Sequence, residues 1–186
     1  MTLTLGRLVL AAAFAACVGL GPEVLSMEWA IGLAALALLE ELTDLFDGMA
    51  ARRFGTASVL GGLLDPLSDS LSRLTIYFAM ALAGWVTIAA PLVMTGRDLV
   101  VAYTRTVQAL TGGKTSARVS GKLKAVVQGG AIPVLVLLAW HAGGDPAKVE
   151  AVRGGVTAAV IAVTLWSLAD YVRGAAKTAA TLHAQR

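Results

Sequence analysis

The chain of 186 residues has little charge, two histidines and a single cysteine. Charged residues make up 15% and hydrophobic residues 57% of it, whereas a soluble domain is about one-quarter charged and about half apolar. This balance argues against an ordinary soluble domain and favours an integral membrane protein. Because Cys17 is the only cysteine, an internal disulfide and a thiolate metal site are both excluded. We see no linker, repeat or low-complexity tract and expect one domain over residues 1–186.

Long apolar runs dominate the chain. A membrane-spanning helix needs about 20 mainly apolar residues. The candidate segments are residues 4–21, 28–50, 59–84, 87–109, 122–141 and 153–173. Because the connections between them are short, we expect an all-α integral membrane protein of six antiparallel transmembrane helices, followed by a short polar tail.

The distribution of basic residues predicts the orientation of these helices. Lysine and arginine are enriched on the cytoplasmic side of membrane proteins, and tryptophan marks the interfaces. One set of helix ends carries Arg52, Arg53, Lys114, Arg118, Lys122, Lys124, Arg173, Lys177 and Arg186. The opposite ends carry Trp29, Trp85 and Trp140. We therefore expect both termini in the cytoplasm.

The N-terminal segment "MTLTLGRLVLAAAFAACVGL" has a second interpretation. A basic residue, an apolar run and small residues before Cys17 are also typical of a secretory or lipoprotein signal peptide. Its removal would leave five helices and would place the basic C-terminal residues outside the cell.

Four aspartates lie within the stretch "EELTDLFDGMAARRFGTASVLGGLLDPLSDS", inside or beside the apolar segments. They are Asp44, Asp47, Asp65 and Asp69. The first two are three residues apart and the last two are four apart, so each pair shares one helix face. If the two segments form an antiparallel hairpin centred near residue 56, all four carboxylates lie at a similar depth.

Four carboxylates at one depth in a membrane require protonation, salt bridges or divalent cations. Oxygen ligands without histidine or cysteine suit Mg²⁺ or Mn²⁺. Two such ions about 3.5–4 Å apart would hold a diphosphate and stabilise displacement at phosphorus. The alternatives are carboxylates that pair with Arg52, Arg53 and Arg73 to fix helix packing, and the ion site of a transporter.

The pattern Asp44-x2-Asp47-Gly48-x2-Ala51-Arg52-x8-Gly61-x3-Asp65-x3-Asp69 resembles the signature of the CDP-alcohol phosphatidyltransferases. The segments "LTLGR", "GRDLVVAYTR", "SGKLKAVVQ" and "VTLWSLADYV" are similar to the bacterial branch that makes phosphatidylglycerophosphate. That branch commonly has threonine where this chain has Ala125.

The resemblance implies six transmembrane helices, usually in a homodimer, with a polar cavity open to the cytoplasm. It implies transfer of a phosphatidyl group from CDP-diacylglycerol to glycerol 3-phosphate, with release of CMP. Inositol phosphate or another alcohol is the alternative acceptor. The implied ligands of two Mg²⁺ or Mn²⁺ ions are Asp44, Asp47, Asp65 and Asp69, and Asp69 is also the implied general base. The implied nucleotide and diphosphate contacts are Gly48, Ala51, Arg52 and Gly61.

Basic residues of the fourth and fifth segments form a candidate site for the acceptor. Arg97 and Arg105 are eight residues apart and lie on broadly one helix face. Arg118 and Lys122 lie near the start of the fifth segment. Turned inward, these cations would hold the phosphate of a phosphorylated alcohol. Alternatively, Arg118, Lys122 and Lys124 only contact anionic headgroups.

A membrane prenyltransferase, which also binds a diphosphate through aspartate pairs, is a more remote interpretation, as is the transporter. The expected partners are the two substrates, membrane lipids and a second copy of the chain, without nucleic acid. We expect a multi-pass protein of the bacterial cytoplasmic membrane, with its active site facing the cytoplasm.

Overall fold

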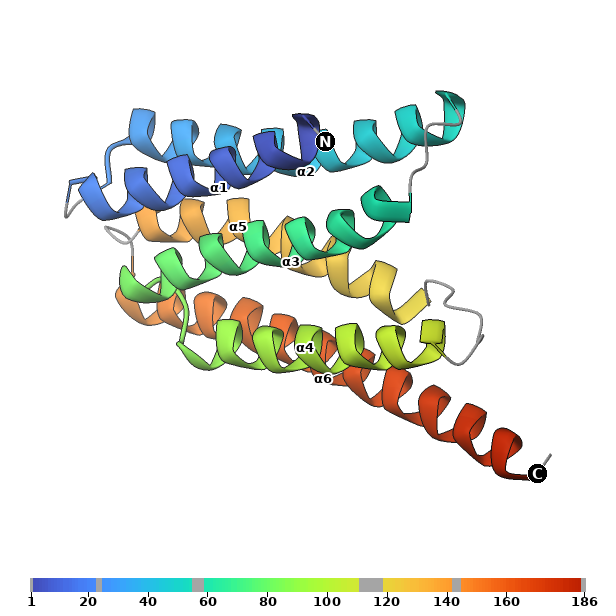
Figure 1. Cartoon of the computed structure of the whole chain (residues 1–186). Coiled ribbons are helices and arrows are strands. Elements are labelled where there is room, and N and C mark those ends of the chain that lie inside the picture. The colour runs from blue at the N-terminus through green and yellow to red at the C-terminus, as the bar shows by residue number, and fades with distance from the viewer. Residues whose placement is uncertain (1, 23–24, 55–58, 111–118, 142–144, 185–186) are drawn as a thin grey trace.

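In a computed structural model of the chain, the described residues form six helices (Figure 1). The structure describes residues 2–22, 25–54, 59–110, 119–141 and 145–184, and it describes side chains within 6–22, 25–43, 66–106, 119–141 and 145–176. The helices are α1 (Thr2–Leu20), α2 (Met27–Phe54), α3 (Val59–Leu82), α4 (Ala89–Leu110), α5 (Val119–Trp140) and α6 (Pro146–Ala184). The expectation of an all-helical chain with six long helices is confirmed over these residues.

The helices are arranged as a closed ring of neighbours. Helix α1 contacts α2 and α3, α3 contacts α4, α4 contacts α6, α6 contacts α5, and α5 contacts α2. Successive helices run in opposite directions, so the start of α1, the end of α2 and the start of α3 lie at one end of the bundle (Figure 1). We call this the motif end. Helix α1 therefore lies between the two helices that carry the aspartate pattern.

Helix α6 is longer than expected at both ends. At its start, the Asp145 carboxylate accepts a hydrogen bond from the backbone N–H of Ala147 at 3.1 Å, and Pro146 occupies the first turn, where no backbone donor is needed. At its other end, the alanine-rich segment after residue 173 continues the helix to Ala184, because alanine is the strongest helix former. The predicted spanning segment 153–173 lies within this helix, which also includes most of the residues expected to form a polar tail.

The exterior of the bundle is apolar and its interior is partly polar. Large apolar side chains such as Val9, Leu82 and Val126 are 67%, 87% and 71% exposed. Several charged side chains are instead buried, namely Arg7, Glu40, Arg73, Arg97 and Lys124. A soluble domain buries its large apolar residues and almost never buries a charge fully. The reversed distribution suits a bundle whose outer face contacts lipid tails.

The two halves of the interior differ. Away from the motif end, the core is apolar and contains Phe14, Leu33, Met80, Ile132 and Val160, each at most 2% exposed. Toward the motif end, the interior contains the buried charges. The apolar half fixes the helices relative to one another, and the polar half is where binding or catalysis is expected.

Two described helices, α5 and the stretch Pro146–Ala176 of α6, are long and apolar enough to cross a membrane by length and composition. Trp29 lies in the first turn of α2, Trp85 follows the end of α3 and Trp140 is the last residue of α5, so these three tryptophans lie toward the helix ends opposite the motif end. Trp29 and Trp140 are 37% and 36% exposed, as suits an interfacial side chain.

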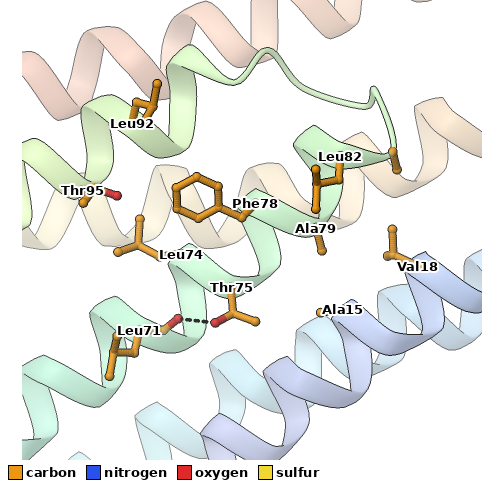
Figure 2. A pocket seen from close by; sticks show the side chains of 12 residues that line it. Ala15, Val18, Leu71, Leu74, Thr75, Phe78, Ala79, Leu82, Leu92 and Thr95 are labelled. Atoms are coloured by element: carbon orange, nitrogen blue, oxygen red, sulfur yellow. Dashed lines mark hydrogen bonds between the residues drawn. The ribbon is translucent and has the colours of Figure 1, made fainter.

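The outer face of α3 forms one wall of an apolar groove between α1, α3 and α4 (Figure 2). Leu74 and Phe78 of α3 and Leu92 of α4 are among the side chains that line it. The Thr75 hydroxyl donates to the Leu71 carbonyl of its own helix at 2.8 Å, so it offers little to a polar ligand. Helix α3 thus has an apolar groove face and, on its other side, a charged interior face.

Candidate active site

The aspartate pattern lies on α2 and α3 near the motif end. Asp44 and Asp47 are within the last three turns of α2, and Asp65 and Asp69 are within the first three turns of α3. The described side chains include Asp69 but not those of Asp44, Asp47, Gly48, Ala51, Arg52, Gly61 or Asp65. Among the described residues, no group of three or more histidine, cysteine, aspartate or glutamate side chains could hold a metal ion. The predicted metal and nucleotide contacts therefore stay predictions.

Asp69 lies in the interior beside a buried arginine from α1. Its side chain is 35% exposed and forms an ion pair with the Arg7 guanidinium. Arg7 itself is only 3% exposed, and its second terminal nitrogen lies 3.2 Å from a carboxylate oxygen of Glu40 on α2. One side chain of α1 thus connects the two helices that carry the aspartates.

A second ion pair connects α3 with α2. The Arg73 guanidinium donates to the Glu41 carboxylate at 2.8 Å. That carboxylate lies against Gly129 of α5, where an added β-carbon would overlap it. Asp69, Arg73 and Tyr77 follow one another at four-residue spacing and therefore share the interior face of α3. The Tyr77 hydroxyl donates to the Gln128 carbonyl of α5 at 2.8 Å.

These contacts bear on the interpretation in which Arg73 pairs with the motif aspartates. Arg73 donates its hydrogen bond to Glu41, and the counter-charge in contact with Asp69 comes from Arg7. The sequence pattern assigns no role to Arg7, which lies in the segment "LTLGR". An arginine in the first turns of an apolar helix was the signal that could have identified it.

A second charged cluster occupies the interior between α4, α5 and α6. Asp98 of α4 accepts hydrogen bonds from the neighbouring Arg97 at 2.7 Å and from Lys124 of α5 at 2.9 Å. The other terminal nitrogen of Arg97 donates to the Ser167 hydroxyl of α6 at 2.9 Å. Asp98 is thus a local partner of Arg97.

Arg105, two turns further along α4, contacts α6. Its guanidinium donates to the Tyr171 hydroxyl at 2.9 Å. The guanidinium carbons of Arg97 and Arg105 lie 5.1 and 5.6 Å from the centre of the Tyr171 ring. The spacing argument for Arg97 and Arg105 is therefore met, because both reach the same aromatic side chain.

The remaining residues of the candidate acceptor site have different surroundings. Lys122 is exposed on α5, whereas Lys124 is buried. Arg118 lies outside the described residues. Between Lys122 and Lys124, the fold thus directs Lys124 into the interior, and the roles of Arg118 and Lys122 in an acceptor site stay predictions.

The motif end therefore contains two charged groups that face the interior. The carboxylate group consists of Glu40, Glu41 and Asp69 with their arginine partners, and the cation cluster consists of Arg97, Arg105 and Lys124 with Asp98. Such an arrangement places carboxylates on α2 and α3 and cations on α4 and α5. It is suited to bring a metal-bound diphosphate and a second anion together at one end of a membrane bundle.

A model of the CDP-alcohol phosphatidyltransferase family matches residues 1–168 of the chain. Because this match covers most of the sequence, the chain belongs to the CDP-alcohol phosphatidyltransferase family, a family of phosphatidyl-transferring enzymes.

Particular relatives come from enteric bacteria. Proteins named CDP-diacylglycerol–glycerol-3-phosphate 3-phosphatidyltransferase from Shigella flexneri serotype 5b, Salmonella typhimurium and Escherichia coli K12 are each 31% identical to the chain. Each alignment spans 160 residues, or 81% of this chain and 82% of the relative. The branch suggested by the sequence segments agrees with the names of these relatives.

Proposed function

We propose that the protein transfers a phosphatidyl group from CDP-diacylglycerol to glycerol 3-phosphate, giving phosphatidylglycerophosphate and CMP. The relatives named for this reaction support the proposal. The structural observation that carries it is the buried cation cluster of α4 and α5 at the same end of the bundle as the aspartate pattern. A site for the diphosphate of CDP-diacylglycerol alone would not need this second cluster of cations.

The aspartate pattern supplies the ligands for two Mg²⁺ or Mn²⁺ ions in this proposal. The donor set fits, because Asp44, Asp47, Asp65 and Asp69 offer only carboxylate oxygens. Bound there, the ions would neutralise the charge of the diphosphate and of the departing CMP. Gly48, Ala51, Arg52 and Gly61 would line the cytidine nucleotide and its phosphates.

Asp69 acts as the general base in this proposal. A hydroxyl oxygen of the acceptor forms a new bond to the phosphorus of the phosphatidyl group, the anhydride bond to CMP breaks, and Asp69 takes the hydroxyl proton. Arg7 holds the Asp69 carboxylate from the side of α1. Because Arg7 is buried and also bonded to Glu40, it restricts where that carboxylate can point.

The cation cluster supports a phosphorylated acceptor. Its members, Arg97, Arg105, Lys124 and Asp98, together carry a formal net charge of +2, and a further carboxylate, Asp170 of α6, lies nearby and accepts a hydrogen bond from Ser120 at 2.6 Å. A phosphate monoester carries a charge of about −1.5 to −2 near neutral pH. Glycerol 3-phosphate and inositol phosphate would both match this charge, whereas serine, which has no phosphate, would not.

The membrane topology forms part of the proposal. We place all six helices across the bacterial cytoplasmic membrane, with the motif end, both termini and the active site on the cytoplasmic side. The enrichment of lysine and arginine at the motif end supports this orientation. The whole chain acts as one transmembrane domain, and we propose a homodimer as in the family.

The test is CMP release by the purified protein in detergent with CDP-diacylglycerol and Mg²⁺. Glycerol 3-phosphate, inositol 1-phosphate and serine are compared as acceptors, and we expect stimulation by glycerol 3-phosphate. Stimulation by another alcohol would overturn the acceptor, and the absence of CMP with every acceptor would overturn the reaction. Asp69→Asn should abolish turnover while CDP-diacylglycerol binding persists, and near-normal turnover of that variant would refute the general-base role.

A further inference from the structure

Tyr171 of α6 lies at the centre of the cation cluster. Its side chain is buried at 5% exposure, and the guanidiniums of Arg97 and Arg105 both lie within cation–π distance of its ring. Its hydroxyl also accepts a hydrogen bond from Arg105 at 2.9 Å. One aromatic side chain thus contacts both guanidiniums.

The two arginines differ in how fully the fold holds them. Arg97 is 8% exposed, and its two terminal nitrogens donate to Asp98 and Ser167. Arg105 is partly exposed and forms no ion pair with any described residue. Its guanidinium donates a hydrogen bond to the Tyr171 hydroxyl. Arg105 thus has a charge that no described carboxylate neutralises, and its orientation depends on Tyr171.

The backbone of α5 completes the arrangement. Gly121 lies beside Tyr171, and a β-carbon there would come within 3.3 Å of the Tyr171 hydroxyl and 3.5 Å of an Arg97 terminal nitrogen. The missing side chain allows the tyrosine and the arginine to lie close to the helix. The Tyr171 ring of α6 thus lies against side chains of α4 and the backbone of α5.

We propose that Tyr171 is a positioning residue that orients Arg97 and Arg105 so that the two guanidiniums bind one phosphate of the acceptor alcohol. This inference rests on the proposed function. It gives a role in the acceptor site to Tyr171, a side chain that is uncharged and lies outside the aspartate pattern. Tyr171 itself need not touch the acceptor.

The experiment compares the full-length wild type with Tyr171→Phe and Tyr171→Leu in detergent. Tyr171→Phe removes the hydroxyl that bonds to Arg105 and keeps the ring, whereas Tyr171→Leu removes both. The control is the same pair of changes at Tyr103, which is 73% exposed on α4. The measured quantities are kcat, KM for glycerol 3-phosphate, KM for CDP-diacylglycerol and the inhibition constant of inorganic phosphate against the acceptor.

We expect Tyr171→Phe to raise the acceptor KM and the phosphate inhibition constant together by roughly 10-fold. Tyr171→Leu should raise both by roughly 30-fold or more, since the cation–π contacts are also lost. KM for CDP-diacylglycerol should stay within about two-fold of wild type. Equal increases in both KM values, a fall in kcat alone, or Tyr171 variants that match the Tyr103 variants would overturn the inference.

A wild type without turnover would refute the proposed function and not by itself the role of Tyr171. In that case, stabilisation of the protein by inorganic phosphate, measured as a shift in Tm, decides the inference. A shift in wild type that is reduced in Tyr171→Phe supports it. No shift, or equal shifts in both proteins, overturns it.

Discussion

Replacing Arg7 with methionine should destabilise the bundle, because the buried Glu40 loses the guanidinium in contact with it and keeps only the more distant charge of Arg73. Arg7 and Glu40 are 3% and 1% exposed, and their charged atoms lie 3.2 Å apart. At an effective dielectric constant of about 20, that separation corresponds to roughly 5 kcal/mol of Coulomb attraction. Removal of one partner from a buried pair costs about 3–5 kcal/mol. Because Asp69 is 35% exposed and stays hydrated, we expect a value near the lower limit, about 3 kcal/mol.

The assay is equilibrium unfolding in mixed micelles of mild detergent and dodecyl sulfate, followed by tryptophan fluorescence. Arg153→Met is the matched control, since Arg153 pairs with Glu150 at the opposite end, where Glu150 is 64% exposed. That exposed pair should contribute at most about 1 kcal/mol.

A double-mutant cycle separates the ion pair from simple loss of packing. Glu40→Gln in the Arg7→Met background should cost less than it does alone, with a coupling free energy of about 1–3 kcal/mol. Additive losses, or an Arg7→Met variant as stable as the Arg153→Met control, would refute the view that Arg7 joins α1 to α2.

Three further predictions concern the same end of the bundle. Gly129→Ala should push the Glu41 carboxylate, the far end of a flexible side chain, away from α5. Gly130→Ala meets open space and gains only the higher helix propensity of alanine. Gly129→Ala should therefore be less stable than Gly130→Ala by about 1 kcal/mol, measured as a lower Tm, and equal Tm values would contradict the close contact at Gly129. Lys124→Met should raise KM for glycerol 3-phosphate by roughly 10-fold or more in steady-state kinetics. Lys122→Met, at an exposed position, should change this KM by about two-fold or less. A larger increase in KM for Lys122→Met than for Lys124→Met would place Lys122, and not Lys124, in the acceptor site. Removal of divalent cations with EDTA should abolish CMP release, and Mg²⁺ or Mn²⁺ should restore it; full activity in excess chelator would refute the metal site.

The sequence predicts the helices well because their apolar runs are long and continuous. It places α3 within two residues at its end, since Val59 and Leu82 bound a run that stops at the Ala83–Gly84 turn. It fails at the end of α6, because alanine allows a helix to continue where the polar residues suggest a tail. The helix propensity of these residues, and not their hydropathy, therefore determines where α6 ends.

The charged interior was only partly predictable. Residue spacing brings Arg97 and Arg105 to one face of α4, but it contains no information about Tyr171 on α6, which is 66 residues from Arg105 in the chain. Likewise, the sequence does not distinguish Lys122 from Lys124, because both are lysines near the start of α5. Lys124 is buried because of the way α5 is rotated about its axis in the bundle. Partners that come from distant helices depend on the order of the helices in the ring, which hydropathy does not encode.

The ring order explains why α1 carries a charge at all. Helix α1 contacts both α2 and α3, so a cation on its inner face can reach carboxylates of both helices at once. A buried arginine satisfied by two carboxylates costs less than one satisfied by a single partner, since more of its donors are bonded. Arg7 is therefore placed where one cation serves two helices, and any conformational change that separates α2 from α3 must first break its contact with Glu40 or with Asp69.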